Sequence, residues 1–331
     1  MSPRGNRTAE MSDLRNRLIL ESGLSRWDVE RIIASAPRRY KSYEIPKRSG
    51  GMREIAQPAR ELKVLQRILI GELLDRLPVH DCAMAYREGR SIKNNAFAHA
   101  GHTPILKMDF VEFFPSIRSE DWIEYCRANN ILSDDECLMT AQLLFRKAPK
   151  EYVMRLSIGA PSSPIVSNIL MFEFDRLVSA EADRRKIAYT RYADDLTFSG
   201  QRAGILKDMI QVVEHASRQI ARPKIRVNEK KTTLVTPKYR RAVTGLVLTN
   251  EGKLSLGRER KRIISAKVHH ALLRRLTESE LQALCGYLAF AKAVEPEFLG
   301  RLREKYGSNI IREIQRTVVK DRRSSSEVET D

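Results

Sequence analysis

Three aspartates are the residues of this sequence best suited to chemistry. Asp194 and Asp195 are adjacent in the segment RYADDLTFSG, whose aromatic and β-branched residues predict a hairpin with both carboxylates at its tip. Asp109 ends the otherwise apolar, strand-like segment ILKMDF. An aspartate pair at a turn commonly has only a conformational role. The presence of a third carboxylate, Asp109, favours a catalytic role for these aspartates over a purely conformational one.

Three carboxylates brought together would repel one another and raise one another's pKa unless cations lay between them. Such oxygen ligands suit Mg²⁺, which prefers carboxylates, water and substrate phosphates. Two ions about 4 Å apart can activate a hydroxyl and stabilise a departing pyrophosphate. The aspartates therefore predict a magnesium site for phosphoryl transfer on nucleotides.

The second informative feature is positive charge. The 331 residues include 59 Lys and Arg against 42 Asp and Glu, a net charge of +17. Residues 222–275 hold 16 basic and three acidic residues, so this short segment carries +13 of the total. Its two basic runs, separated by the strand-like AVTGLVL, favour a polyanion-binding surface over a merely solvated face. Membrane attachment is the weaker alternative, because no aromatic amphipathic helix is evident there.

Several protein classes are disfavoured. The four cysteines form no CxxC pair, which argues against a zinc site or a disulfide scaffold. Apolar runs such as Ile68-Leu69-Ile70 are far shorter than the roughly 20 residues of a membrane span. The N-terminus has no apolar core of a secretory signal. We therefore expect a cytoplasmic protein with no membrane partner.

The elements around the aspartates follow from periodicity and turn residues. Helices are expected over 24–34, 59–78, 119–126, 163–178 and 203–220. Strands are expected on either side of Gly50-Gly51, over 103–110, in the hairpin 187–200 and over 224–227. Their irregular alternation predicts an α+β sheet with helices on one face.

With these motifs in order, about residues 24–315 resemble the reverse transcriptases, and more narrowly the bacterial retron reverse transcriptases. Residues 107–117 (KMDFVEFFPSI) resemble the first palm motif, and Tyr-Ala-Asp-Asp at 192–195 the catalytic hairpin. GAPSSP at 159–164 is similar to the template-gripping motif, and VNEKKT at 227–232 to the following Asn-x-x-Lys motif. NAFAH at 95–99 and VTG at 243–245 match two retron signatures.

The resemblance implies roles for individual residues. Asp109, Asp194 and Asp195 would hold two Mg²⁺ ions, with the Phe110 carbonyl completing a shell. Four further residues would contact the nucleotide, with Phe114 as the gate against a 2′-hydroxyl: Arg53, Lys47, Phe114 and Lys231. Each role has an alternative. Phe114 could be a core aromatic residue, and Arg53 could be an exposed charge on a strand. Lys231 could contact the nucleic-acid backbone. RNA contacts are implied for Asn95, His99, Val243, Thr244, Gly245, Arg258, Lys261 and Lys267. A satisfied structural histidine is the alternative for His99.

One position departs from the family pattern. The template-gripping motif usually begins Pro-Gln-Gly, whereas this chain has Ser157-Ile158-Gly159. Ile158 cannot make the hydrogen bond of that glutamine, which puts the usual nucleotide contact or the normal efficiency in doubt.

The resemblance further implies a right-hand polymerase. Residues 1–40 would form an N-terminal tail and helix, 41–235 the fingers and the palm with its antiparallel sheet, 236–320 a basic, mostly helical thumb that binds RNA, and 321–331 a disordered tail. The activity would be RNA-directed DNA synthesis from dNTPs on a cognate structured non-coding RNA. Starting from a 2′-hydroxyl, it would give branched RNA-linked single-stranded DNA (msDNA). A separately encoded effector would act with it in antiphage defence.

Two alternatives stay open. One is a group II intron-like reverse transcriptase, although those usually extend beyond the thumb and only about 11 residues follow the last expected helix here. The other is a non-catalytic RNA-binding protein with a polymerase-like fold, for which Ile158 is the supporting hint.

Overall fold

The computed structural model describes residues 14–47, 50–236 and 238–324. The chain divides into two compact units. The first comprises residues up to 91 together with 104–235, and the second comprises 92–103 together with 236 onwards. The short segment 92–103 therefore belongs to the unit formed by the C-terminal part of the chain. The assignment of fingers, palm and thumb to residue ranges stays a prediction.

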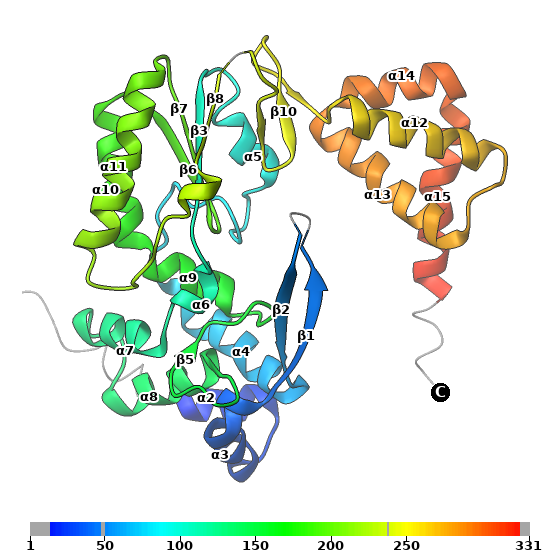
Figure 1. Ribbon diagram of the computed structural model, residues 1–331. Helices are drawn as coiled ribbons and strands as arrows, with labels where there is room; N and C mark the ends of the chain where they lie inside the picture. Colours follow the sequence, from blue (N-terminus) through cyan, green and yellow to red (C-terminus); the bar gives the residue numbers. More distant parts are fainter. Residues whose placement is uncertain (1–13, 48–49, 237, 325–331) are drawn as a thin grey trace, which may run out of the picture. The chain divides into compact units, whose positions relative to one another are not determined.

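The centre of the first unit is a four-stranded antiparallel sheet with the order β6-β7-β3-β8. Its strands are β3 (Ile105–Asp109), β6 (Ala188–Tyr192), β7 (Asp195–Ser199) and β8 (Thr233–Val235). Helices α10 (Phe172–Arg184) and α11 (Ala203–Gln219) lie side by side along the sheet (Figure 1). Buried side chains of β3, β7 and both helices form one hydrophobic core. The predicted hairpin and the predicted α11 are confirmed.

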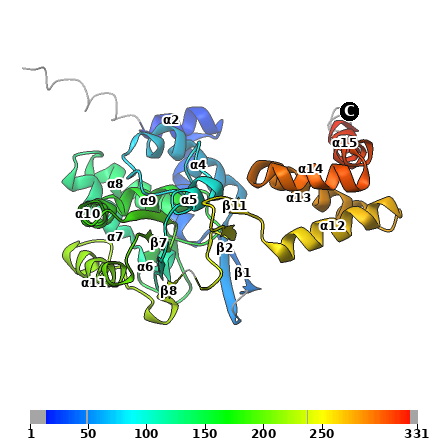
Figure 2. The same cartoon turned by 90° about the horizontal axis from the view of Figure 1, so that it is seen from above.

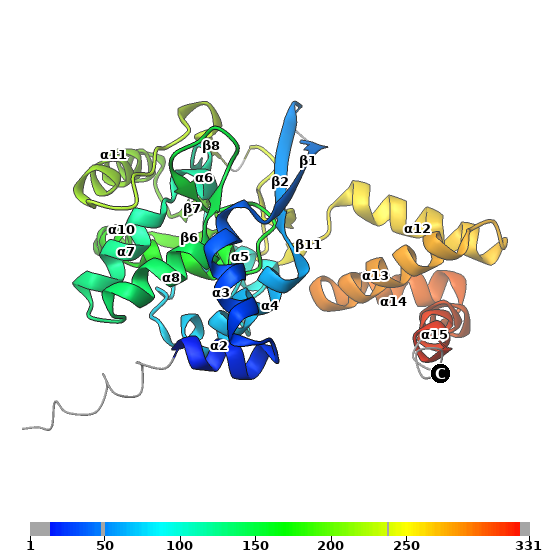
Figure 3. The same ribbon diagram turned by 90° about the horizontal axis from the view of Figure 1, so that it is seen from below.

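A second hairpin, β1 (Tyr40–Pro46) with β2 (Met52–Pro58), extends as a two-stranded ribbon from the helices of this unit (Figures 2 and 3). Helix α4 (Arg60–Glu72) follows it and buries Leu62, Leu65 and Leu69 completely, as the helical spacing predicts. The remaining elements of the unit are α2 (Leu14–Ser22), α3 (Arg26–Ser35), η1 (Ala36–Arg38), η2 (Leu74–Arg76), α6 (Phe113–Ser116), α7 (Ser119–Ala128), α8 (Asp134–Leu144), β4 (Arg146–Lys147), β5 (Met154–Arg155), α9 (Ser163–Leu170) and η3 (Glu229–Lys231).

The second unit combines a small sheet with a helical bundle. Its elements are α5 (Ile92–Phe97), β9 (Ala242–Val243), β10 (Leu246–Leu248), β11 (Leu254–Ser255), α12 (Arg258–Leu272), α13 (Glu278–Val294), α14 (Pro296–Tyr306) and α15 (Ser308–Ser324). Helices α12 to α15 pack on one another, as Figure 3 shows. Helix α13 begins at a capping box in which Thr277 and Glu280 bind each other's backbone N–H groups.

Some expectations need correction. The strand predicted over 224–227 is wrong, because only Val227 pairs there, with Phe110, and the strand that joins the sheet is β8. Between them the Asn228 N–H donates to the Asp109 carbonyl at 2.7 Å, so the chain turns at the end of β3 before running beside it. The single helix predicted over 163–178 is two helices, α9 and α10.

Near both ends of the chain the structure has helical residues that the sequence analysis did not predict. Helix α2 was not predicted, although Leu14 and Leu18 are spaced one turn apart and buried. The backbone of residues 321–324 continues α15, against the prediction of disorder from 321. The rest of that tail and residues 1–12 lie outside the described residues.

Candidate active site

The sheet brings the three aspartates together. Asp109, the last residue of β3, lies opposite Asp195, the first residue of β7. Asp194 stands in the two-residue turn between β6 and β7, and its carbonyl accepts a hydrogen bond from the Phe110 N–H at 3.3 Å. Residues separated by some 85 positions in the sequence thus meet at one end of the sheet.

The carboxylates of Asp194 and Asp195 resist ionisation because both have a raised pKa. Burial and the charge of Asp109 raise the pKa of Asp194, against the opposing effects of Lys231 and Arg53. Burial, Asp194 and Asp109 together raise the pKa of Asp195 to about 6. The negative charge at this edge of the sheet is therefore incompletely balanced by the protein, which favours a cation from solution.

Lys231 supplies one positive charge to the cluster. Its Nζ atom lies 3.0 Å from Asp109 Oδ1 and 2.9 Å from Oδ2. The lysine is about half exposed while Asp109 is buried, so the ammonium group reaches the carboxylate from the solvent side. Lys231 comes from η3, the turn that follows the Asn228–Asp109 hydrogen bond.

The donor set fits magnesium by its chemistry. Hard carboxylate oxygens of three residues meet here, and both oxygens of Asp109 already bind a cationic group. In the described residues, however, no group of three or more His, Cys, Asp or Glu side chains has the arrangement of a formed metal site. Lys231 occupies both oxygens of Asp109, so a metal ion at this carboxylate requires the lysine to withdraw.

The raised pKa of Asp195 predicts a pH-dependent stability. Its pKa in the folded, metal-free chain, about 6, lies above the ordinary 3.8. Below about pH 4 the Asp195 carboxyl group is protonated in both the folded and the unfolded chain and does not change the free energy of unfolding. Between pH 4 and 6 its ionisation lowers the free energy of unfolding by a growing amount, which becomes constant above pH 6. Asp195→Asn should raise the free energy of unfolding in EDTA by about 1 kcal/mol at pH 7.5, a modest value because solvent still reaches this residue and screens the charge of its partly covered carboxylate.

Urea unfolding at several pH values measures this effect. The gain of Asp195→Asn should vanish at pH 4, whereas Asp208→Asn on the exposed face of α11 should show no such trend. A gain that is the same at pH 4 and pH 7.5 would contradict the electrostatic origin.

The aspartate turn is held by a buried ion pair. Arg191 and Asp175 are both fully buried, with Nε to Oδ1 at 2.9 Å and Nη2 to Oδ2 at 2.6 Å. Tyr189 donates to the same carboxylate at 3.1 Å. Arg191 Nη1 also donates to the Ala193 carbonyl and to Asn168 Oδ1, each at 3.1 Å. One guanidinium thus ties helices α9 and α10 to the turn that carries Asp194.

Ala193 needs this support. Its φ angle is +58°, in the left-handed region that costs an L-residue other than glycine roughly 1–2 kcal/mol. The side chain of Ala193 is buried, and its carbonyl is fixed by Arg191. The network therefore stabilises a strained turn and fixes the position of the next residue, Asp194.

The predicted nucleotide residues lie in the same unit. Arg53 is exposed on β2, and its charge partly offsets the rise in the pKa of Asp194 that burial and Asp109 cause. Lys47 is exposed at the tip of that hairpin, where its N–H donates to the Gly51 carbonyl. Phe114 in α6 is half-buried and contacts Phe113 edge-on at 5.4 Å. Phe110 is buried against Phe174, and a metal contact of its carbonyl stays a prediction.

The unusual Ser157-Ile158-Gly159 segment packs on β2. The Ile158 carbonyl accepts a hydrogen bond from the Ala56 N–H at 2.8 Å. Gly159 has φ +121°, and a Cβ there would lie 2.9 Å from the Ala56 carbonyl oxygen. Only glycine fits this close approach, so this loop fixes β2 through its backbone, whatever side chain stands at 158.

The two retron-type signatures meet each other. Asn95 Nδ2 lies 3.4 Å from Thr244 Oγ1, which donates to the Ile92 carbonyl at 3.0 Å. Asn95, His99 and Val243 are at most 1% exposed, and their predicted contacts with RNA stay predictions. The Asn95–Thr244 and Thr244–Ile92 hydrogen bonds join α5 to the β9–β10 turn. A direct RNA contact remains a prediction for Thr244 and Gly245.

The predicted RNA contacts on α12 differ in their surroundings. Arg258 is exposed at the start of the helix. Lys261 pairs with Glu295, and Lys267 lies 3.5 Å from Glu280. Both pairs hold α12 to other helices of the bundle, and their role towards RNA stays a prediction.

Sequence reasoning missed Arg191, Asp175, Asn168 and Tyr86. Two signals were available in the sequence. Arg191 is a charged residue inside an otherwise apolar strand, and Asp175 is a charged residue on an apolar helix face. Tyr86 lies close enough to Asp194 for that carboxylate to help raise its pKa, after the larger effect of burial. No sequence pattern indicates this tyrosine.

Comparison with known proteins identifies the class to which this sheet and its acidic hairpin belong. The family "Reverse transcriptase (RNA-dependent DNA polymerase)" matches residues 45–300. The chain is 38% identical to the Retron Ec83 reverse transcriptase of Escherichia coli over 87% of its own length and 94% of that protein. It is 33% identical to the Retron Ec86 reverse transcriptase of Escherichia coli, covering 84% and 86%.

This chain belongs to the reverse transcriptase family and, within it, to the retron reverse transcriptases. The predicted α+β right-hand polymerase fold and the predicted RNA-directed DNA polymerase activity are confirmed. Among solved structures, a Candida albicans telomerase complex aligns with a TM-score of 0.45 at 14% identity, over 83% of this chain and 60% of that one. A likeness this low carries no argument about function. Within the described residues no helix has the length and apolarity to cross a membrane.

Proposed function

We propose that this chain binds a cognate structured non-coding RNA and copies part of it into msDNA, branched single-stranded DNA linked to that RNA. The observation that carries the proposal is the meeting of Asp109, Asp194 and Asp195 at one end of the sheet. High identity to retron enzymes over nearly the whole chain supports the retron substrate. The same likeness motivates a cytoplasmic role in antiphage defence with a separately encoded effector.

The reaction joins a primer hydroxyl to the α-phosphate of a dNTP and releases pyrophosphate. Asp109, Asp194 and Asp195 would hold two magnesium ions, which when bound activate the hydroxyl and stabilise the developing charge. Arg53 would neutralise the triphosphate, a task that suits a guanidinium. Lys231, once released from Asp109, would face the departing phosphates. Most of the rate would come from positioning and charge stabilisation.

The test uses purified protein, its candidate RNA, dNTPs and Mg²⁺. Periodate treatment of the RNA destroys its 3′-terminal diol but leaves internal 2′-hydroxyls intact. Internal 2′ priming therefore predicts that DNA synthesis persists on treated RNA and that the DNA remains linked to RNA. Synthesis that is lost after periodate, or that proceeds equally on unrelated RNA, would favour a group II intron-like enzyme.

Phe114 provides a test of sugar discrimination. A bulky side chain beside the nucleotide would exclude the 2′-hydroxyl of an rNTP, so Phe114→Ala should raise the ratio of rNTP to dNTP incorporation about 100-fold. Phe114→Tyr keeps the ring and should leave the ratio unchanged. Single-nucleotide incorporation with each substrate gives the ratio as kcat/KM values. An unchanged ratio in Phe114→Ala would assign Phe114 to packing alone.

A further inference from the structure

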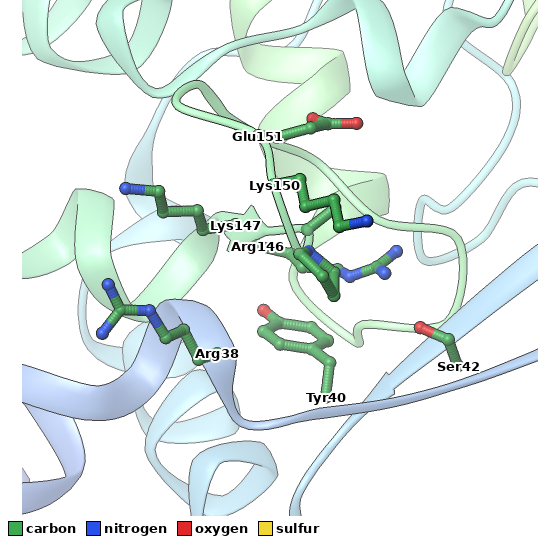
Figure 4. Close-up of a pocket in the computed structure, with 9 residues that line it drawn as sticks. Arg38, Tyr40, Ser42, Arg146, Lys147, Lys150 and Glu151 are labelled. Carbon is green, nitrogen blue, oxygen red and sulfur yellow. The ribbon is translucent and has the colours of Figure 1, made fainter.

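A basic pocket lies at the base of the β1–β2 hairpin. It has a volume of about 500 Å³ and is lined by residues of η1, β1 and the β4–β5 segment. Figure 4 shows Arg38, Arg146, Lys147 and Lys150 arranged around the ring of Tyr40. Tyr40 pairs with Pro58, whereas Arg53 lies opposite Ile45, five residues further along β1. At about 3.3 Å per residue, the pocket is roughly 17 Å along the hairpin from Arg53.

Most of the positive charge in this pocket is uncompensated. Arg146 is only 13% exposed and pairs with Glu54 at 2.8 Å. Glu151, the acidic residue of the lining, is already paired with Arg155 at 3.3 Å. Among the residues that the structure describes, no carboxylate lies within 4.0 Å of Arg38, Lys147 or Lys150. Three cations, one from η1 and two from the β4–β5 segment, therefore face a cavity whose acidic lining residue is already paired with Arg155.

An aromatic side chain adjoins these cations. Tyr152 is 94% exposed, and Lys147 Nζ lies 5.9 Å from the centre of its ring. An exposed tyrosine of this size has no packing role, since almost none of its surface is covered. Aromatic rings beside basic grooves bind single-stranded nucleic acids, because every base can stack on them.

We propose that this pocket and Tyr152 bind a single-stranded stretch of RNA, with phosphates at Arg38, Lys147 and Lys150 and one base on Tyr152. The proposal rests on the proposed function, which makes RNA the partner of this chain. Several separated cations around an open cavity suit successive phosphates of a strand better than one mononucleotide. The pocket would thus hold RNA away from the reacting nucleotide.

Salt dependence of binding tests the phosphate contacts. The triple variant Arg38→Gln/Lys147→Gln/Lys150→Gln is compared with Arg202→Gln/Lys207→Gln/Arg218→Gln, which removes three charges on or beside the exposed face of α11. Fluorescence anisotropy with a labelled, unstructured 12-nucleotide RNA gives affinity between 50 and 200 mM salt. The association constant K falls as salt rises, so the slope of log K against log salt is negative. The pocket variant should reduce the magnitude of this slope by about 2, while the α11 variant keeps the wild-type slope.

The stacking contact has its own test. Tyr152→Ala should weaken binding of the same RNA about tenfold, and Tyr152→Phe should retain it. Equal slopes in the two triple variants would overturn the proposal, even if the wild-type protein synthesises DNA normally. ATP binding is measured in parallel. If the wild-type protein binds ATP and the pocket variant loses that binding with an unchanged RNA slope, the proposal is also overturned, because that result assigns the pocket to mononucleotides. Absence of DNA synthesis by the wild-type protein bears on the proposed function instead.

Discussion

Replacing Asp194 and Asp195 together by alanine is expected to abolish DNA synthesis, with a fall of at least about 10³-fold in rate. Charge stabilisation by a metal site contributes several kcal/mol to such a reaction, and each 1.36 kcal/mol is a factor of ten. The double variant leaves Asp109 alone opposite the turn, paired only with Lys231. Single-turnover incorporation of one dNTP measures the loss.

Misfolding can be separated from loss of chemistry in this experiment. Burial and mutual repulsion raise the pKa values of both aspartates, so their removal should leave the metal-free protein as stable as before or more so. Asp134 and Asp135 form another adjacent aspartate pair, exposed at the start of α8. Alanine at both of those positions should leave synthesis within about twofold, because surface changes rarely exceed 0.5 kcal/mol. Synthesis that survives in the Asp194/Asp195 variant would remove the site from the mechanism.

The second large effect concerns the buried pair beneath the turn. Asp175→Asn would leave the Arg191 guanidinium without its counter-charge in the interior, and breaking such a pair typically costs about 3–5 kcal/mol. We expect a corresponding fall in the free energy of unfolding, measured by urea denaturation. DNA synthesis should fall with it, because the Ala193 carbonyl loses a well-placed donor.

A double variant separates stability from positioning. Asp175→Leu/Arg191→Met replaces both charges by apolar side chains, which often restores stability lost on breaking a buried pair. The hydrogen bond from Arg191 to Ala193 stays absent, so the strained turn is unsupported. We expect near-native stability but roughly 100-fold slower synthesis, the cost of misplacing a catalytic group by about 1 Å. Full recovery of both properties would show that Arg191 does not position Asp194.

The hairpin with Asp194 and Asp195, the apolar strand that ends in Asp109 and helix α4 could be predicted from the sequence, because local turn residues and periodicity determine them. The path from Val227 to β8 could not, since a tertiary hydrogen bond from Asn228 to Asp109 decides where pairing resumes. Asn95 and His99 matched a motif associated with RNA, yet no local pattern indicates that both side chains are buried or that Asn95 contacts Thr244. Arg191 and Asp175 are visible in the sequence as charged residues among apolar ones, but their pairing depends on packing between a strand and a helix, which no local pattern reveals.

Lys231 illustrates the same limit. Its motif indicated a place near the leaving phosphates, and the structure places its ammonium group on Asp109. The two positions are compatible if metal binding releases the lysine.

The most direct test of the central claim is template-directed incorporation by the purified chain on its cognate RNA. Four parallel reactions, each with one labelled dNTP and Mg²⁺, should show addition only of the nucleotide complementary to the first template base, and none in EDTA. Changing that template base should change the incorporated nucleotide accordingly. Tight RNA binding without incorporation in the presence of Mg²⁺ or Mn²⁺ would contradict the account and leave an RNA-binding protein with a polymerase fold.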